Sequence, residues 1–204
     1  EIKHQRPNCG SKSEWSVCYR NLLIGLIYCL LSVSVVWAGE CGSGYCTGSG
    51  TWTVASAAYE DVNYCINTCA TYGDIIKIPS GDKSWSRSVV ISKDLRILGA
   101  GIDSTILRSN FGDGVHAVFF KFQPDATARE RVRTNTGAGT IEVAGFTFVG
   151  NGPDSQGGGT GTHDGVMIYN HPSGVATDVA IRRIIIHHNK FMEMHRAVEI
   201  DGDV

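Results

Sequence analysis

The sequence predicts an all-β protein, a right-handed parallel β-helix whose short strands stack coil upon coil behind an N-terminal capping helix. The first observation is a repeat, because residues 179–191 resemble the stretch around Asn151 when Asn189 is placed on it, a shift of 38 positions. The second is an echo at a shift of 32, with Val198 placed on Val166. The third is the 25 glycines among 204 residues, which suit a fold with frequent corners. Recurring short apolar strands are typical of a solenoid whose coils bury their faces on one another.

Residues 1–38 are predicted to be an extension that does not belong to the folded domain. Arg20 precedes an apolar run over residues 21–38 that ends in Val36-Trp37-Ala38. A basic flank, an apolar core and a small final residue are typical of a secretory signal peptide, cleaved here after Ala38. A retained membrane anchor is the alternative, since about 20 apolar residues are needed to span a bilayer as a helix. The protein is therefore expected to be secreted or held at the cell surface, with membrane contact only through this segment.

Residues 39–204 are expected to form the β-helix domain. The chain stops at Asp201-Gly202-Asp203-Val204 without a terminal cap, so the solenoid is predicted to be truncated at its C-terminus. The net charge of −2 argues against a nucleic-acid partner, because phosphate binding needs a basic face. The protein is expected to act as a monomer.

One amphipathic helix is predicted, from Ser56 as N-cap to Tyr72, with Gly73 as C-cap. One face of this helix carries an apolar stripe, formed by Val62, Cys65, Ile66, Cys69 and Ala70. A single helix ahead of the strands is expected to cover the open end of the first coil.

Four cysteines, Cys41, Cys46, Cys65 and Cys69, follow the predicted cleavage site. In an exported protein this even number is compatible with two disulfides. Cys41 and Cys46 could close a small loop. Cys65 and Cys69, four residues apart on a helix, are expected to be two small buried hydrophobic residues rather than a bridge.

Short strands are predicted after the helix because apolar residues alternate between turn signals. The expected strands are Ile75 to Ile78, Ser88 to Ser92, Leu95 to Leu98, Thr105 to Leu107 and Val118 to Phe122. Two longer insertions, residues 123–140 and 150–165, are read as loops that either face a ligand or are merely solvated.

The run from Asp61 to Leu107 resembles the N-terminal cap and first coils of the pectin lyase-like superfamily of right-handed parallel β-helices. The similarity lies in the order of the motifs: a helix, a Gly-Asp start to a strand, a Pro-x-Gly turn, a strand ending in Gly-x-Gly, and a Thr-Ile-Leu strand. The resemblance implies a polysaccharide lyase or glycoside hydrolase. None of the catalytic motifs Asn-Thr-Asp, Asp-Asp or Arg-Ile-Lys occurs in the sequence.

Candidate catalytic residues lie on the last predicted strand. If Val198 and Ile200 point inward, Glu199 and Asp201 point to solvent about 7 Å apart. That separation suits the acid and base of an inverting glycosidase. Arg196 is a weaker candidate base, and His195 is a further candidate catalytic residue.

The same strand could also bind calcium, because clustered carboxylate oxygens are the ligands that Ca²⁺ prefers. Asp201, Glu199 and Asp203 are the candidate ligands.

The preceding strand is expected to supply substrate-binding residues. If Val166 and Ile168 point inward, Met167 and Tyr169 point outward beside the acidic pair. His163 and Asp164 precede that strand, and His195 takes the matching place one coil later, so these histidines could line a groove. His187 and His188 are expected to play a structural role at a coil corner.

The function predicted from these observations is binding and cleavage of an extracellular acidic polysaccharide. The alternative is a non-catalytic adhesive β-helix that presents loops to a glycan or a protein. The two differ in whether outward acidic residues stack across adjacent coils, since a catalytic groove requires such a stack.

Overall fold

The computed structural model describes residues 41, 44–111, 117–134, 139–150, 163–169 and 183–201. The chain divides into two units, Glu1–Gly39 and Glu40–Val204, and every described residue belongs to the second. The predicted signal peptide or anchor and Asp203 lie outside the described residues.

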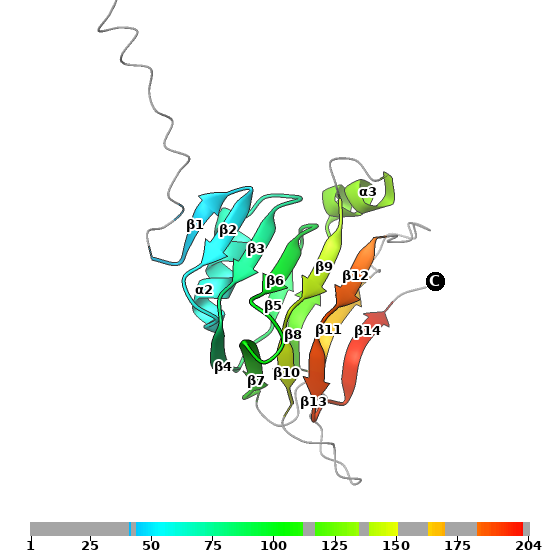
Figure 1. Ribbon diagram of the computed structural model, residues 1–204. Helices are drawn as coiled ribbons and strands as arrows, with labels where there is room; N and C mark the ends of the chain where they lie inside the picture. The colour runs from blue at the N-terminus through cyan, green and yellow to red at the C-terminus, as the bar shows by residue number, and fades with distance from the viewer. Residues whose placement is uncertain are drawn as a thin grey trace, which may run out of the picture. The chain divides into compact units, whose positions relative to one another are not determined.

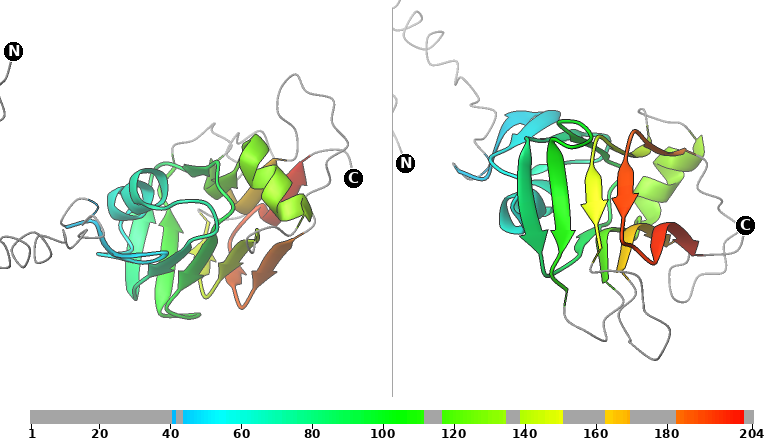
Figure 2. Two further views of the ribbon diagram at one scale, coloured as in Figure 1. Left: turned by 90° about the horizontal axis from the view of Figure 1, so that it is seen from above. Right: turned by 60° about the horizontal axis from the view of Figure 1, so that its bottom comes forward.

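The described residues contain fourteen strands arranged in three sheets, which Figures 1 and 2 show as layers of neighbouring strands. Sheet A consists of β1 (Cys46–Ser49), β2 (Thr51–Val54), β3 (Ile75–Ile78), β6 (Arg96–Gly99), β9 (Ile141–Ala144) and β12 (Ile184–His187). Sheet B consists of β4 (Gly81–Trp85), β7 (Thr105–Ser109), β10 (Thr147–Val149) and β13 (Lys190–Met192). Sheet C consists of β5 (Val89–Ile91), β8 (Ala117–Phe122), β11 (His163–Tyr169) and β14 (Arg196–Asp201).

The prediction of a right-handed parallel β-helix with a single capping helix is wrong as stated. Sheet A is mixed, because β1 runs antiparallel to β2, and the described residues hold two short α-helices rather than one. The reversal occurs at Gly50, whose φ of +65° lies in the left-handed region that glycine adopts without strain. The parallel pairing within sheets B and C is compatible with the repeats in the sequence.

The register of the first repeat also differs from the prediction. Ile141 pairs with Ile184, and Phe148 with Phe191, so the true shift is 43 positions rather than 38. The error arose because β9 and β10 both carry apolar residues two positions apart. The expected shift therefore aligned β12 with β10 instead of with β9.

The side chain of Asn189 helps to hold the observed register. Its Nδ2 donates to the carbonyl of Val143 at 2.8 Å, and its Oδ1 accepts from the backbone N–H of Phe146 at 3.0 Å. Asn189 therefore lies over the corner between β9 and β10.

The predicted helix is shorter than expected and changes geometry along its length. α2 (Tyr59–Tyr64) continues into a π-helical segment, η1 (Cys65–Cys69), which ends before the predicted cap Gly73. The five residues of the apolar stripe are all buried, as predicted. The disulfide pairing was not predicted, since Cys41 is bonded to Cys69 while Cys46 and Cys65 are buried free thiols.

The interior is filled by residues at equivalent positions of neighbouring strands. Ile76, Ile97 and Val143 are paired across sheet A and are fully buried. Phe148 and Phe191 stack with their ring centroids 5.2 Å apart. Such like-on-like packing explains why an apolar pattern recurs along the sequence.

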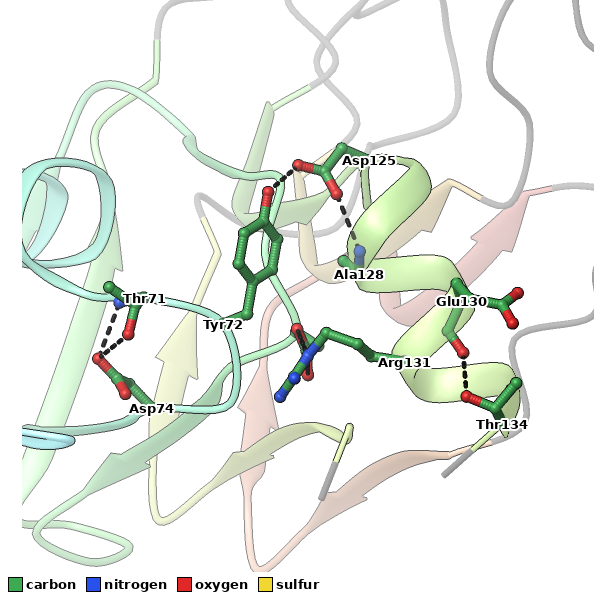
Figure 3. Close-up of polar contacts among 9 residues, drawn as sticks. Thr71, Tyr72, Asp74, Asp125, Ala128, Glu130, Arg131 and Thr134 are labelled. Atoms are coloured by element: carbon green, nitrogen blue, oxygen red, sulfur yellow. Dashed lines mark hydrogen bonds and ion pairs between the residues drawn. The ribbon is translucent and has the colours of Figure 1, made fainter. Parts of the chain in front are cut away.

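The insertion at residues 123–140 contains a helix that the sequence did not reveal, α3 (Ala126–Thr134). Asp125 caps it by accepting from the backbone N–H of Ala128 at 2.9 Å and also bonds the hydroxyl of Tyr72 (Figure 3). Arg131 reaches from the helix to the fully buried carboxylate of Asp94, 3.0 Å away. Burial raises the pKa of Asp94, and Arg131 opposes that rise. Asp125 and Arg131 thus help to dock α3.

Candidate functional site

The predicted site lies on sheet C, where β8, β11 and β14 run side by side. Met167 pairs with Glu199, and Tyr169 pairs with Asp201, as the shift of 32 predicted. On its other side Met167 pairs with Lys121 of β8. Three strands therefore bring basic, aromatic and acidic residues together.

Tyr169 is the aromatic residue of this surface and is partly exposed. The ammonium of Lys121 lies 4.7 Å from the centroid of the Tyr169 ring, within the range of a cation–π contact. Met167, which was predicted to point outward beside it, is only 1% exposed. The open part of the surface is thus formed by Tyr169 and its charged neighbours.

The acidic residues of β14 differ in their partners. Glu199 forms an ion pair with Arg196, three residues earlier on the same strand. A guanidinium stays protonated in proteins, so Arg196 can orient Glu199 but is a poor base. Asp201 is exposed.

The phenol of Tyr169 is influenced by both carboxylates. Its pKa is raised first by burial and then by the negative charges of Asp201 and Glu199. The phenol therefore remains protonated at neutral pH and can donate a hydrogen bond to a ligand.

The structure buries Asp164, with the exposed His195 near it. Asp164 is fully buried, in register with Val118 and Arg196. Nδ1 of His195 lies 3.8 Å from its Oδ1. A fully buried carboxylate cannot contact a polysaccharide directly, and 3.8 Å is too long for a hydrogen bond to His195. His163 contributes the first residue of β11, and its side chain is outside the described residues.

Calcium binding by Glu199, Asp201 and Asp203 stays a prediction, because Asp203 lies outside the described residues. Among them no group of three or more His, Cys, Asp or Glu side chains could hold a metal ion. Glu199 is already neutralised by Arg196, and a calcium ion prefers six to eight oxygen ligands.

A second charged group, on the outer face of sheet A, was missed by sequence reasoning. Glu142 is 7% exposed and lies between Nε of Arg96, at 2.5 Å, and Nε2 of His187, at 2.9 Å. Burial alone would raise the pKa of Glu142, but the hydrogen bonds from Arg96 and His187 outweigh it and lower the pKa. His187 also approaches His188, with the two Nδ1 atoms 2.5 Å apart. The signal available in the sequence was Glu142, an acidic residue inside the otherwise apolar strand Ile141–Ala144. Its partner Arg96 can be found only from the pairing of β6 with β9.

An open hollow of about 340 Å³ lies on the same sheet. Its lining comes from β2, β3, β6 and the residues that follow them, and includes Lys77 and Leu98. In the described part of the chain Lys77 has no ion-pair partner.

No family model matches the chain, and neither a curated protein nor a solved structure is similar to it. The resemblance to the pectin lyase-like superfamily therefore stays a prediction. Among the described residues no helix has the length and apolar character that crossing a membrane requires.

Proposed function

We propose that the protein is exported and binds and cleaves an acidic extracellular polysaccharide on the outer face of sheet C. The observation that carries the proposal is the convergence of Lys121, Tyr169, Glu199 and Asp201 from three adjacent strands. Export is supported by the disulfide between Cys41 and Cys69, since such bonds persist in oxidising compartments.

This set of side chains suits a charged sugar. An aromatic side chain offers an apolar face to the C–H groups of a pyranose ring and a hydroxyl at its tip. Lys121 supplies a positive charge beside that ring for a sugar carboxylate. The surface can therefore contact both the apolar and the charged parts of a uronic acid.

Cleavage is assigned to the two carboxylates of β14. Residues two apart on a strand lie about 7 Å from one another, inside the range of about 6.5–9.5 Å for an inverting hydrolase. The ion pair with Arg196 orients Glu199, which suits the base that activates water. Asp201, exposed on the same strand, is then the acid that protonates the leaving oxygen.

A non-catalytic glycan-binding protein is the second candidate. It is favoured because the described acidic residues of this surface lie on one strand, whereas the neighbouring positions carry Lys121, Met167 and Tyr169. A catalytic groove would be expected to stack acidic residues across strands.

The test is binding and product release over a panel of acidic and neutral polysaccharides, with calcium and with a chelator. A hydrolase releases reducing ends without an unsaturated product, and Glu199→Gln and Asp201→Asn should each abolish that release while retaining binding. An unsaturated, ultraviolet-absorbing product that depends on calcium would instead indicate a lyase.

Two lysine variants decide where the polysaccharide binds. Lys121→Met should weaken binding of acidic polymers, and the matched control Lys77→Met on sheet A should not. Binding without any cleavage would leave the second candidate, and no binding to any polymer would contradict both.

A further inference from the structure

We propose that Cys46 and Cys65 form a second disulfide bond beside the bond between Cys41 and Cys69. Cys46, on β1, is 3% exposed, and Cys65, the first residue of η1, is fully buried. Both lie in one hydrophobic cluster, and each is close in the sequence to one half of the Cys41–Cys69 bond.

Three contacts hold the same two chain segments together. The disulfide joins Cys41 to Cys69. The rings of Tyr45 and Tyr64 stack with centroids 4.4 Å apart. The two free cysteines directly follow these tyrosines, and all of the cysteines lie in one hydrophobic cluster. These contacts hold the two segments that carry Cys46 and Cys65 side by side.

Forming the bond removes one proton from each thiol and two electrons from the pair. The acceptor is a disulfide-containing thiol oxidoreductase, which is reduced to its dithiol. One cysteine thiolate attacks the disulfide of the oxidant to give a mixed disulfide. The second thiolate then attacks this intermediate and releases the reduced oxidant. The oxidising compartment that the Cys41–Cys69 bond needs supplies the same chemistry.

The timing follows from the burial of the thiols. Burial raises the pKa of Cys65. Thiolate is therefore scarce once the segment is packed. The bond must close while β1 is still open to the oxidant, before it docks on α2.

The two bonds would be nested. Cys41 and Cys69 are 28 positions apart, and Cys46 and Cys65 both lie within that loop. Together they would pin β1, at the edge of sheet A, to the helical segment α2–η1. If one of the two bonds were reduced, the other would still hold β1 to α2–η1.

The direct test is differential alkylation of the full chain, isolated without reductant from an oxidising compartment. The protein is unfolded in denaturant with one alkylating reagent, reduced, and labelled with an isotopic form of the same reagent. Mass spectrometry with fragmentation then reads the label on each cysteine. We expect Cys46 and Cys65 to carry the second label, as Cys41 and Cys69 do. The first label on Cys46 and Cys65 would overturn the proposal.

A second test isolates the proposed bond in the double variant Cys41→Ser with Cys69→Ser. Adding reductant should lower the Tm of this variant by about 5–10 °C, because only the proposed bond remains to be broken. The matched control adds Cys46→Ser and Cys65→Ser and should show no reductant effect. An equal response of the two variants would contradict the proposal, and the alkylation result decides the matter if either variant fails to fold.

Discussion

The outer faces of sheets A and C use similar side chains in opposite ways. On sheet A the Glu142 carboxylate is almost completely covered by Arg96 and His187. On sheet C, Tyr169 is partly exposed and Asp201 is exposed. The first arrangement satisfies its charges within the protein, whereas the second leaves groups that a ligand can reach. Charged residues in register are therefore no sign of a binding site until their burial is known.

The largest expected effect is on sheet A. Glu142→Gln removes the negative charge that Arg96 and His187 share, and should lower the free energy of unfolding by about 2–3 kcal/mol. For a chain of this size the Tm should fall by about 4–10 °C. Thermal unfolding checks this. Glu130→Gln, which breaks the exposed pair with Arg133, should cost no more than about 0.5 kcal/mol. Equal losses of stability in the two variants would mean that the buried Glu142 stabilises the fold no more than an exposed ion pair does.

The pH dependence sharpens the same comparison. The pKa of Glu142 is lower in the folded protein than in the unfolded chain. Its contribution is therefore fully present above the unfolded pKa of about 4.3, and is lost as the pH falls through the folded pKa. The difference in unfolding free energy between the wild type and Glu142→Gln should therefore shrink as the pH falls below about 4. Denaturant titrations at a series of pH values measure it, and a difference that persists undiminished at about pH 2 would contradict the assignment.

The smallest expected effect is on sheet C. Asp201→Asn should change the free energy of unfolding by less than about 0.5 kcal/mol, because Asp201 is exposed. The substitution should reduce polysaccharide cleavage and leave the free energy of unfolding nearly unchanged. A loss of stability comparable with that of Glu142→Gln would make Asp201 a structural residue and would weaken the proposed function.

The strands were predictable where apolar residues alternate between turn signals. Ile75 to Ile78 was predicted with the bounds of β3, and the shift of 32 placed Tyr169 beside Asp201 as observed. The antiparallel pair β1–β2 was missed because its residues are mostly glycine, serine and threonine. α3 was missed because its apolar face consists of little more than Ala128 and Val132.

The site could be predicted only in part because burial depends on distant segments. Asp164 was expected to bind substrate, but its position places it in the interior. The group around Glu142 could not be found with a register in error by five positions, because Arg96, Glu142 and His187 come together only in the observed pairing. Local patterns identify strands, whereas charge networks depend on which strands are neighbours.

The chain reversal at Gly50 also bears on self-association. An unpaired sheet edge can template the addition of strands from other molecules and so start a fibre. At this edge of sheet A, β1 is a four-residue strand that runs against the direction of β2, and only Cys46 among its residues is buried. This short edge strand exposes only Thr47, Gly48 and Ser49. Very short edge strands are one means by which proteins limit strand addition, so β1 protects this edge of sheet A against self-association.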